Sequence, residues 1–435
     1  MKKILFILSL SLMLLGCSSS VDRSQILKVY NWADYIDEDL IEEFEDWYEE
    51  CTGEKVDIIY QTFDINETML SKIELGHEDY DVVCPSDYII ERMLRNDLLL
   101  PLDKDFGDDP NYLDNIAPYI EQKFNEIDGK GKNANDYAVA YMWGTVGLIY
   151  NPKYVSSEEA QSWKVLQNPA YRGKILMKDA FRDVYTALAI GLNREAIDAG
   201  EKDMNELAFD TSAEAIAQVE TFLDSFKESV CGWEADFGKE QMTKELAWMN
   251  LSWSGDAQWA IDEAAEVGME LEYTVPSEGS AVWFDGWVIP KYAKNVKAAR
   301  YFINFMCKPE NAIRNMDMTG YVSAIGGAEV LESMTDEEYD AIDVSYFFGE
   351  EADSICINPI MYPDKETIDK CGVMHDTDTE ALLKMWSRVK GDNASAWTYI
   401  LIFLVFSGLI TAVIIKYTRK RYRRRRYSKR RNKRK

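Results

Sequence analysis

The chain has 435 residues, of which 47% are hydrophobic and 12% aromatic, so its length and composition exclude a disordered chain and a single small domain. Its formal net charge is −28, but residues 416–435 contain 14 Lys or Arg and no acid, which leaves 34 basic and 76 acidic residues in the rest of the chain. A body this acidic argues against nucleic-acid binding, which needs a basic surface. With two histidines in the chain, we expect neither a metal site nor a Ser-His-Asp hydrolase, and no cofactor.

The start of the chain predicts an exported lipoprotein. Two lysines precede an apolar run over residues 4–15, which is typical of a signal peptide and short for a membrane span. The Leu-Leu-Gly-Cys motif at 14–17 resembles a bacterial lipobox, so we expect residues 1–16 to be removed and Cys17 to be lipidated. An ordinary signal peptide with an incidental cysteine is the alternative. The six remaining cysteines permit up to three disulfides, and their positions select no pairing.

The first part of the body alternates between strands and helices. Short apolar stretches predict strands at residues 26–30, 55–63 and 80–84, and apolar side chains at helical spacing predict helices at residues 37–51, 66–75 and 88–95. Gly53 is expected to end the first helix and Asn66 to cap the second. A βαβαβα order implies a parallel sheet covered by helices.

A second set of elements follows and predicts a second α/β lobe. We expect strands at residues 174–177 and 246–253, and helices at residues 182–192, 213–226, 256–266, 296–306 and 309–318. No repeat of 20–50 residues and no low-complexity linker interrupts the body. The natural division of this length is therefore two α/β lobes.

The end of the chain predicts a membrane span with a cytoplasmic tail. Residues 397–415 carry no charge, and 19 residues of helix reach about 28 Å, which is close to the thickness of a hydrocarbon core. The basic residues 416–435 follow at once, and the positive-inside rule places them in the cytoplasm. A buried core helix is the alternative. Both ends of the chain thus predict a body on the extracytoplasmic face of the cytoplasmic membrane, in a periplasm or at a cell surface.

Aromatic and acidic residues occur together where the predicted strands end. Ligands of open parallel sheets bind beyond the carboxyl ends of the strands. The segments at these positions are 31–35, 85–88, 179–183 and 254–256, and segment 282–285 adds a further aromatic–carboxylate pair. Carboxylates bind ammonium groups, and aromatic faces attract cations and cover methylenes, so this mixture favours a linear aliphatic polycation. For any single pair, a core tryptophan beside a solvated acid is the alternative.

Six short motifs, in a shared order within residues 25–390, resemble the spermidine/putrescine-binding proteins of bacterial ABC importers. They are YNWADY at 30–35, NETM at 66–69, YDVVCPSDY at 80–88, WSGD at 253–256, WFD at 283–285 and TGY at 319–321. The resemblance implies an α/β, two-lobe periplasmic-binding-protein fold of type II character with hinge crossovers. The N-terminal lobe would consist of residues 25–138 and 281–329, and the C-terminal lobe of residues 139–280 and 330–392.

The resemblance also implies a set of ligand contacts. Trp253 and Trp283 would flank the methylene chain, Asp285 would meet a central amine and Asp183 a terminal amine. The remaining contacts would be Trp32, Asp34, Tyr35, Ser86, Tyr88, Asp256 and Tyr321. Three departures stand out: Ala33 replaces a threonine, Ala180 aligns with a terminal-amine acid beside Asp179, and Asp256 is similar to the Trp-x-Gly-Asp of putrescine-selective members.

These observations predict a binding protein and not an enzyme. We expect a membrane-anchored polyamine-binding protein, for putrescine or spermidine, that delivers its ligand to the permease subunits of an ABC importer. A polyamine receptor or sensor that feeds no permease is the first alternative, because the C-terminal helix and basic tail are not usual in this family. A hydrolase with a carboxylate pair is the second alternative, although no spacing of acids singles out such a pair.

Overall fold

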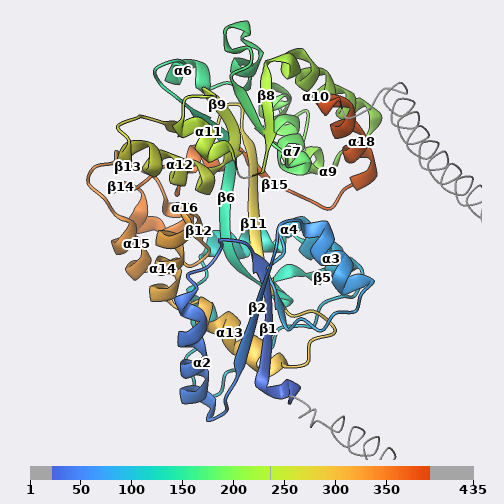
Figure 1. Ribbon diagram of the computed structural model, residues 1–435, viewed down its shortest axis with the longest axis vertical. Coiled ribbons are helices and arrows are strands. Elements are labelled where there is room, and N and C mark those ends of the chain that lie inside the picture. The colour runs from blue at the N-terminus through green and yellow to red at the C-terminus, as the bar shows by residue number, and fades with distance from the viewer. Residues whose placement is uncertain (1–21, 236, 392–435) are drawn as a thin grey trace, which may run out of the picture. The chain divides into compact units, whose positions relative to one another are not determined.

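The computed structural model describes residues 22–235 and 237–391 (Figure 1). The predicted signal peptide at 1–16, Cys17, the predicted membrane span at 397–415 and the tail at 416–435 lie outside the described residues. Within the described part, no helix combines the length and the apolar character that a membrane span needs. Of the described residues, those up to Leu382 form one compact unit, and the end of helix α18 from Leu383 belongs to a second.

The first lobe is built on parallel strands that begin the body. β1 (Ile26–Trp32) pairs in parallel with both β2 (Asp57–Phe63) and β3 (Val82–Val83). The helices and short strands of this lobe are α2 (Asp39–Thr52), α3 (Asn66–Glu74), α4 (Asp87–Arg95), α5 (Pro118–Asn125), β4 (Asp128–Gly129), β5 (Lys132–Asn133), α13 (Val296–Met306) and α14 (Pro309–Thr319). The βαβαβα order predicted for residues 26–95 is therefore present, with the third strand shorter than predicted.

Two helix ends of this lobe test the sequence signals directly. In α2, the buried Leu40, Phe44 and Tyr48 recur every four residues, and Gly53 ends the helix in the left-handed conformation, as expected. Asn66, by contrast, does not cap α3, because Ile65 holds the cap position. The Asn66 side-chain amide instead donates to the hydroxyl oxygens of Ser86 and Tyr88, at 3.0 and 3.1 Å. The Asn66 side chain, which was expected to cap the helix, therefore forms tertiary hydrogen bonds instead.

The second lobe contains three parallel strands in the order β9-β7-β8. These strands are β7 (Ile175–Lys178), β8 (Val230–Glu234) and β9 (Met249–Trp253), and β10 (Glu272–Thr274) joins the sheet elsewhere. The helices of this lobe are α6 (Ser157–Ala160), α7 (Phe181–Gly191), α8 (Arg194–Asp198), α9 (Met204–Phe209), α10 (Ala213–Phe226), α11 (Gly238–Thr243) and α12 (Ser254–Glu266). Figure 1 shows α7 and α10 to one side of these strands and α11 and α12 to the other.

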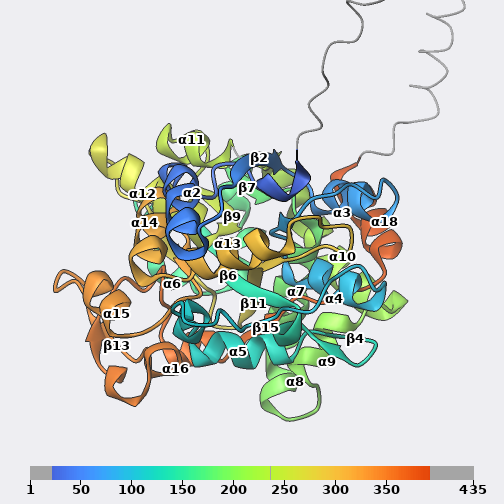
Figure 2. The same cartoon turned by 90° about the horizontal axis from the view of Figure 1, so that it is seen from below.

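Two long strands connect the lobes. β6 (Ala138–Tyr150) and β11 (Ser280–Val288) are buried along their whole length and run antiparallel to each other. β6 pairs with β11 over its first half and with β9 over its second half, so one strand belongs to both lobes. Figure 2 shows β6 and β11 side by side at the centre, with helices around them. Neither strand was among the predicted elements, because both are buried on two faces and lack the regular alternation of apolar and polar residues that marks a half-buried strand.

The last described segment begins against the first lobe. It contains β12 (Val322–Ser323), α15 (Ala328–Met334), β13 (Ala341–Ile342), α16 (Ser345–Phe348), β14 (Ile355–Cys356), α17 (Lys365–Ile368), β15 (Cys371–Val373) and α18 (Thr379–Lys390). Val330, Phe347 and Tyr362 belong to the same buried hydrophobic cluster as β1 and β3. The lobe boundaries at 138, 280 and 329 stay a prediction.

Candidate functional site

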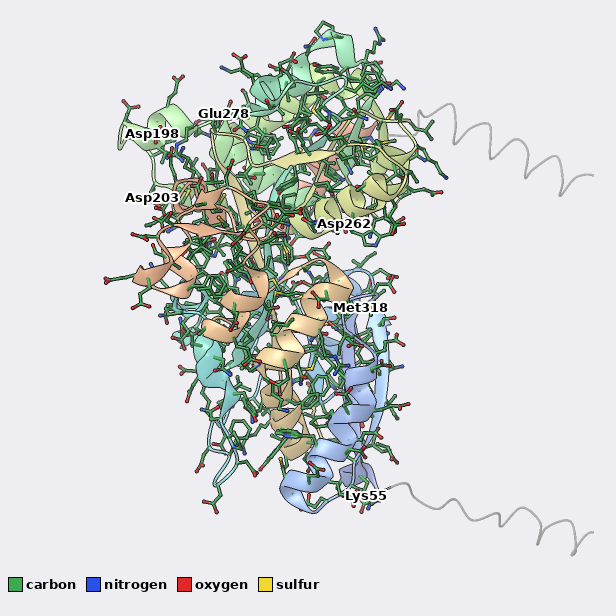
Figure 3. All side chains as sticks on the ribbon, turned by 90° about the vertical axis from the view of Figure 1, so that its left-hand side faces the viewer. Lys55, Asp198, Asp203, Asp262, Glu278 and Met318 are labelled. Atoms are coloured by element: carbon green, nitrogen blue, oxygen red, sulfur yellow. The ribbon has the colours of Figure 1, made fainter. Side chains whose placement is uncertain are left out.

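The predicted ligand-binding residues gather where the two lobes face each other. Tyr35 and Ser86 follow β1 and β3 of the first lobe, and Trp253 ends β9 of the second. Trp283 and Asp285 both lie on β11 and share one face, because side chains alternate along a strand. Figure 3 places Asp262 of α12 and Met318 of α14 on the two sides of this boundary, with Lys55 at the far end of the first lobe.

Asp285 is a buried carboxylate without a compensating cation. It lies beside a bulge between β6 and β11, and 6% of its surface is exposed. Its Oδ2 accepts a hydrogen bond from the Tyr35 hydroxyl at 2.9 Å, and its Oδ1 has no hydrogen-bond partner. Burial and the nearby charge of Asp183 raise its pKa to about 7, against the opposing effect of the Ser86 and Tyr35 hydroxyls.

Asp183 is the second acid of the site. It lies in the first turn of α7 and is half-buried, and its Oδ1 accepts a hydrogen bond from Trp253 Nε1 at 2.8 Å. Burial raises its pKa to about 6, although the Trp253 hydrogen bond and the positive charges of Lys178 and Arg182 act in the opposite direction. No ion pair within 4.0 Å neutralises Asp183 or Asp285 in the described part of the chain.

Buried Asp87 adds to the same negative field. Its carboxylate accepts hydrogen bonds from the backbone N–H groups of Tyr88 and Phe284, at 2.7 and 3.2 Å. Burial, together with the charges of Asp285 and Asp183, raises its pKa well above the usual range. This first-lobe acid was not among the predicted contacts.

Tyr321 connects the aromatic residues of the site. Its ring packs edge-to-face on those of Tyr35 and Trp283, with ring centroids 5.3 and 5.5 Å apart. Its hydroxyl donates to Asp256 Oδ1 at 2.9 Å. The ring lies so close to Gly255 that a Cβ there would meet it at 2.2 Å. The glycine of the WSGD motif is therefore required for this aromatic contact between the lobes.

Asp256 differs from the other acids because the chain itself neutralises it. Its Oδ2 forms an ion pair with Lys178, and its Oδ1 lies 3.5 Å from Lys239 Nζ. Although burial opposes ionisation, these two ammonium groups lower the pKa of Asp256. The resemblance implied a carboxylate that meets the ligand, whereas the structure supplies a lysine as its partner. Lys178 was not predicted, although it directly precedes the acidic and aromatic segment 179–183, because a lysine was not expected among the contacts of a cationic ligand.

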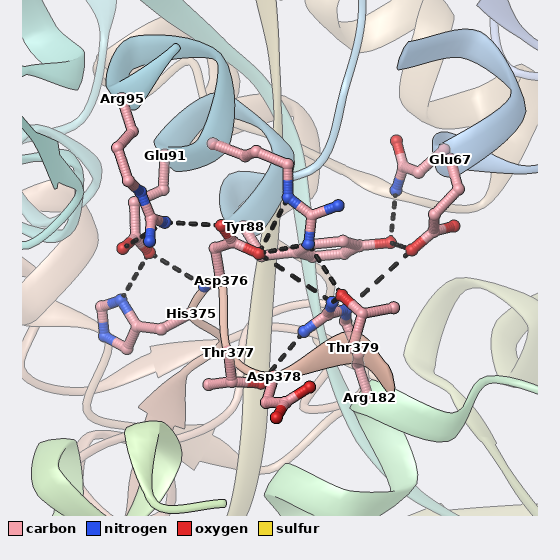
Figure 4. A network of polar contacts seen from close by, with 12 residues as sticks. Glu67, Tyr88, Glu91, Arg95, Arg182, His375, Asp376, Thr377, Asp378 and Thr379 are labelled. Carbon is pink, nitrogen blue, oxygen red and sulfur yellow. Dashed lines mark hydrogen bonds and ion pairs between the residues drawn. The ribbon is translucent and has the colours of Figure 1, made fainter. Parts of the chain in front are cut away.

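Arg182 also supplies a cation from the chain itself, because its guanidinium lies over the ring of Tyr88 (Figure 4). Its guanidinium lies 4.5 Å from the centre of the Tyr88 ring and 4.0 Å from Glu67 of α3. It also donates to the hydroxyl oxygens of Thr377 and Thr379. Tyr88 therefore lies at the boundary as predicted, but one face of its ring already holds a cation from the second lobe.

The first loop contributes less than the resemblance implied. Trp32 is half-buried and packs on Phe63 with ring centroids 4.5 Å apart, and its Nε1 has no partner. Asp34 is exposed and has a positive φ of 52°. Of the three residues predicted in this loop, Tyr35 contacts an acid of the site, through its hydrogen bond to Asp285.

The candidate site is closed by its own side chains. Trp283, Asp256 and Asp285 are each 6% exposed. Two surface hollows, of about 550 and 590 Å³, lie around Met269 and Asp364 and include none of the predicted contacts. The chemistry of the candidate site, a negative field among aromatic rings, is therefore a better guide to its ligand than the size of a cavity.

Comparison with known proteins places this fold and site in a family. The profile of the bacterial extracellular solute-binding proteins matches residues 39–339. The chain belongs to this family. Membership confirms the expectation of a binding protein rather than an enzyme, and it agrees with the two α/β lobes.

Individual members of the family are similar over most of the chain. The spermidine/putrescine-binding periplasmic protein of Escherichia coli is 26% identical over 312 residues, which are 71% of this chain and 80% of that protein. The putrescine-binding periplasmic protein SpuD of Pseudomonas aeruginosa is 28% identical over 404 residues, which are 89% of this chain and 98% of that protein. The structure of the spermidine/putrescine ABC transporter substrate-binding protein PotD of Streptococcus pneumoniae has a TM-score of 0.63 and 29% identity, and it covers 84% of this chain and 98% of its own.

Proposed function

We propose that this protein binds a polyamine and delivers it to an ABC importer. The observation that supports this most directly is the pair of acids Asp285 and Asp183, which lie among Tyr35, Trp253 and Trp283 and form no ion pair in the described part of the chain. A buried anion without a partner is costly, and an ammonium group supplies the missing charge. The aromatic rings then cover the methylenes between two such groups.

The names of the relatives support the same ligand class. The curated relatives described above bind spermidine or putrescine according to their names, and the similarity extends over the candidate site. Calorimetric titration of the full-length protein with putrescine, spermidine, spermine and maltose tests the proposal. Heat from at least one polyamine and none from maltose is expected. Tight binding of maltose, or no heat from any polyamine, would refute the proposal.

We further propose that the body is attached at both ends to the extracytoplasmic face of one membrane, through lipid on Cys17 and a helix at residues 397–415. A single lipid chain anchors only marginally, whereas a spanning helix is effectively irreversible. Cys17→Ala should therefore leave the protein in the membrane fraction, and adding a deletion of residues 394–435 should release it. If Cys17→Ala alone becomes soluble, the predicted span is wrong.

A further inference from the structure

Lys178 lies at the centre of the site, at the end of the middle strand of the second lobe. The strands β9, β7 and β8 run in parallel, and their last residues are Trp253, Lys178 and Glu234. The Lys178 side chain is 1% exposed. Its Nζ lies 4.2 Å from the centre of the Trp253 ring and 3.4 Å from Glu234 Oε1, and it forms an ion pair with Asp256 Oδ2.

The two carboxylates around Lys178 have complete sets of partners. Glu234 accepts from the Asn250 side-chain amide at 3.0 Å and from the Gly238 backbone N–H at 3.1 Å. Asp256 accepts from the Tyr321 hydroxyl and pairs with Lys178. This part of the site therefore needs no cation from outside, in contrast to Asp183 and Asp285.

The surroundings of Lys178 match those that a terminal ammonium of a polyamine would need. An ammonium over a tryptophan face and between two carboxylates combines cation–π and charge-assisted contacts. Here the group occupying that position belongs to the chain. The Nζ of Lys178 stands in for one ammonium of a longer ligand, which leaves Asp183 and Asp285 for the ligand itself, whereas Asp87 is held by two backbone N–H groups.

We propose that Lys178 is a specificity-determining residue, a built-in ammonium that occupies the position at Asp256 and restricts the ligand to a diamine. This inference rests on the polyamine-binding function proposed above. The two ammonium groups of the diamine meet Asp183 and Asp285, and the third charge of a triamine such as spermidine finds its place taken by Lys178. Like charges at this position exclude the longer ligand, so the selection works by repulsion as well as attraction.

Replacing Lys178 with methionine tests the inference, because methionine keeps an apolar side chain of similar length without the charge. Putrescine and spermidine are titrated into full-length wild type and Lys178→Met. The variant should bind spermidine at least tenfold more tightly relative to putrescine than the wild type does, since Asp256 and Glu234 become available to the third ammonium. Lys153→Met is the control: this exposed lysine pairs with Glu245 at 3.0 Å rather than with an acid of the site, so its loss should leave the ratio of affinities unchanged.

A second measurement remains informative if the loss of the Lys178 charge beside Asp256 and Glu234 destabilises the Lys178→Met variant. Propylammonium chloride, which carries the end of a lysine side chain, should raise the melting temperature of Lys178→Met by more than it raises that of the wild type, in which Asp183 and Asp285 alone remain for an added ammonium. The double variant Lys178→Met/Asp256→Asn should lose most of this response and most of the gain in spermidine preference.

The outcomes separate this inference from the proposed function. A wild type that binds polyamines, with the same ratio of affinities in Lys178→Met and no greater stabilisation of that variant by propylammonium, overturns the role of Lys178 alone. A wild type that binds no polyamine overturns the proposed function, and the restriction to a diamine with it. A rise in spermidine preference that Asp256→Asn reverses supports the inference.

Discussion

Replacing Asp285 with asparagine should weaken ligand binding and stabilise the ligand-free protein. Burial raises the pKa of Asp285 from 3.8 to about 7, so the folded protein holds this proton more tightly than the unfolded chain. The protonated form therefore favours the fold below pH 4, and this contribution is lost as the pH rises from about 4 to about 7. About three pKa units correspond to ~4 kcal/mol of lost stability at pH 8.

The asparagine variant should not lose this stability as the pH rises, because an amide side chain does not titrate. Its free energy of unfolding, measured with urea on the full-length protein, should exceed that of the wild type at pH 8 by up to ~4 kcal/mol, with the difference fading toward pH 4. Loss of one charge of a desolvated pair costs about 2–5 kcal/mol, so the affinity for putrescine should fall roughly 30-fold or more.

Asp81→Asn provides a matched control. Asp81 is also fully buried, but it forms an ion pair with Arg23 at 2.7 Å and accepts the backbone N–H groups of Lys294 and Asn295. Removing this paired charge should lower the stability and leave the affinity unchanged. If Asp285→Asn behaves in the same way, with lower stability and unchanged affinity, Asp285 is not an uncompensated acid and the reasoning fails.

Three further predictions concern the same site. Trp283→Ala should weaken putrescine binding about tenfold through lost methylene and cation–π contacts, and equal titration curves for variant and wild type would count against this contact. Ammonium binding favours the ionised forms of Asp285 and Asp183, whose pKa values are about 7 and 6, so the affinity for putrescine should rise from pH 5 to pH 8. Binding should also release protons, which calorimetry in two buffers measures. An affinity that does not change with pH would contradict this prediction. Gly255→Ala should displace the Tyr321 ring and lower both affinity and melting temperature, and an unaltered melting curve would show that the ring adapts.

Part of this structure could be predicted from the sequence alone. The αβ alternation, the helix stop at Gly53 and the aromatic–acid pairs at strand ends are local patterns, and they predicted the fold class and most residues at the lobe boundary. Local patterns work here because the apolar spacing of a helix or strand is written within a few residues. They missed β6 and β11, whose uniform burial leaves no periodicity to read.

The charge state of each acid, in contrast, was decided by the tertiary structure. Asp183, Asp256 and Asp285 look equivalent in the sequence, because each lies near an aromatic residue. The strand order β9-β7-β8 brings Lys178 against Asp256, although 77 residues separate them, whereas Asp285 receives the Tyr35 hydroxyl and no cation. Electrostatic compensation depends on distances of a few ångströms between residues far apart in the chain, so the sequence by itself predicts a site for a cation, and only the folded structure shows which acids are left to bind it.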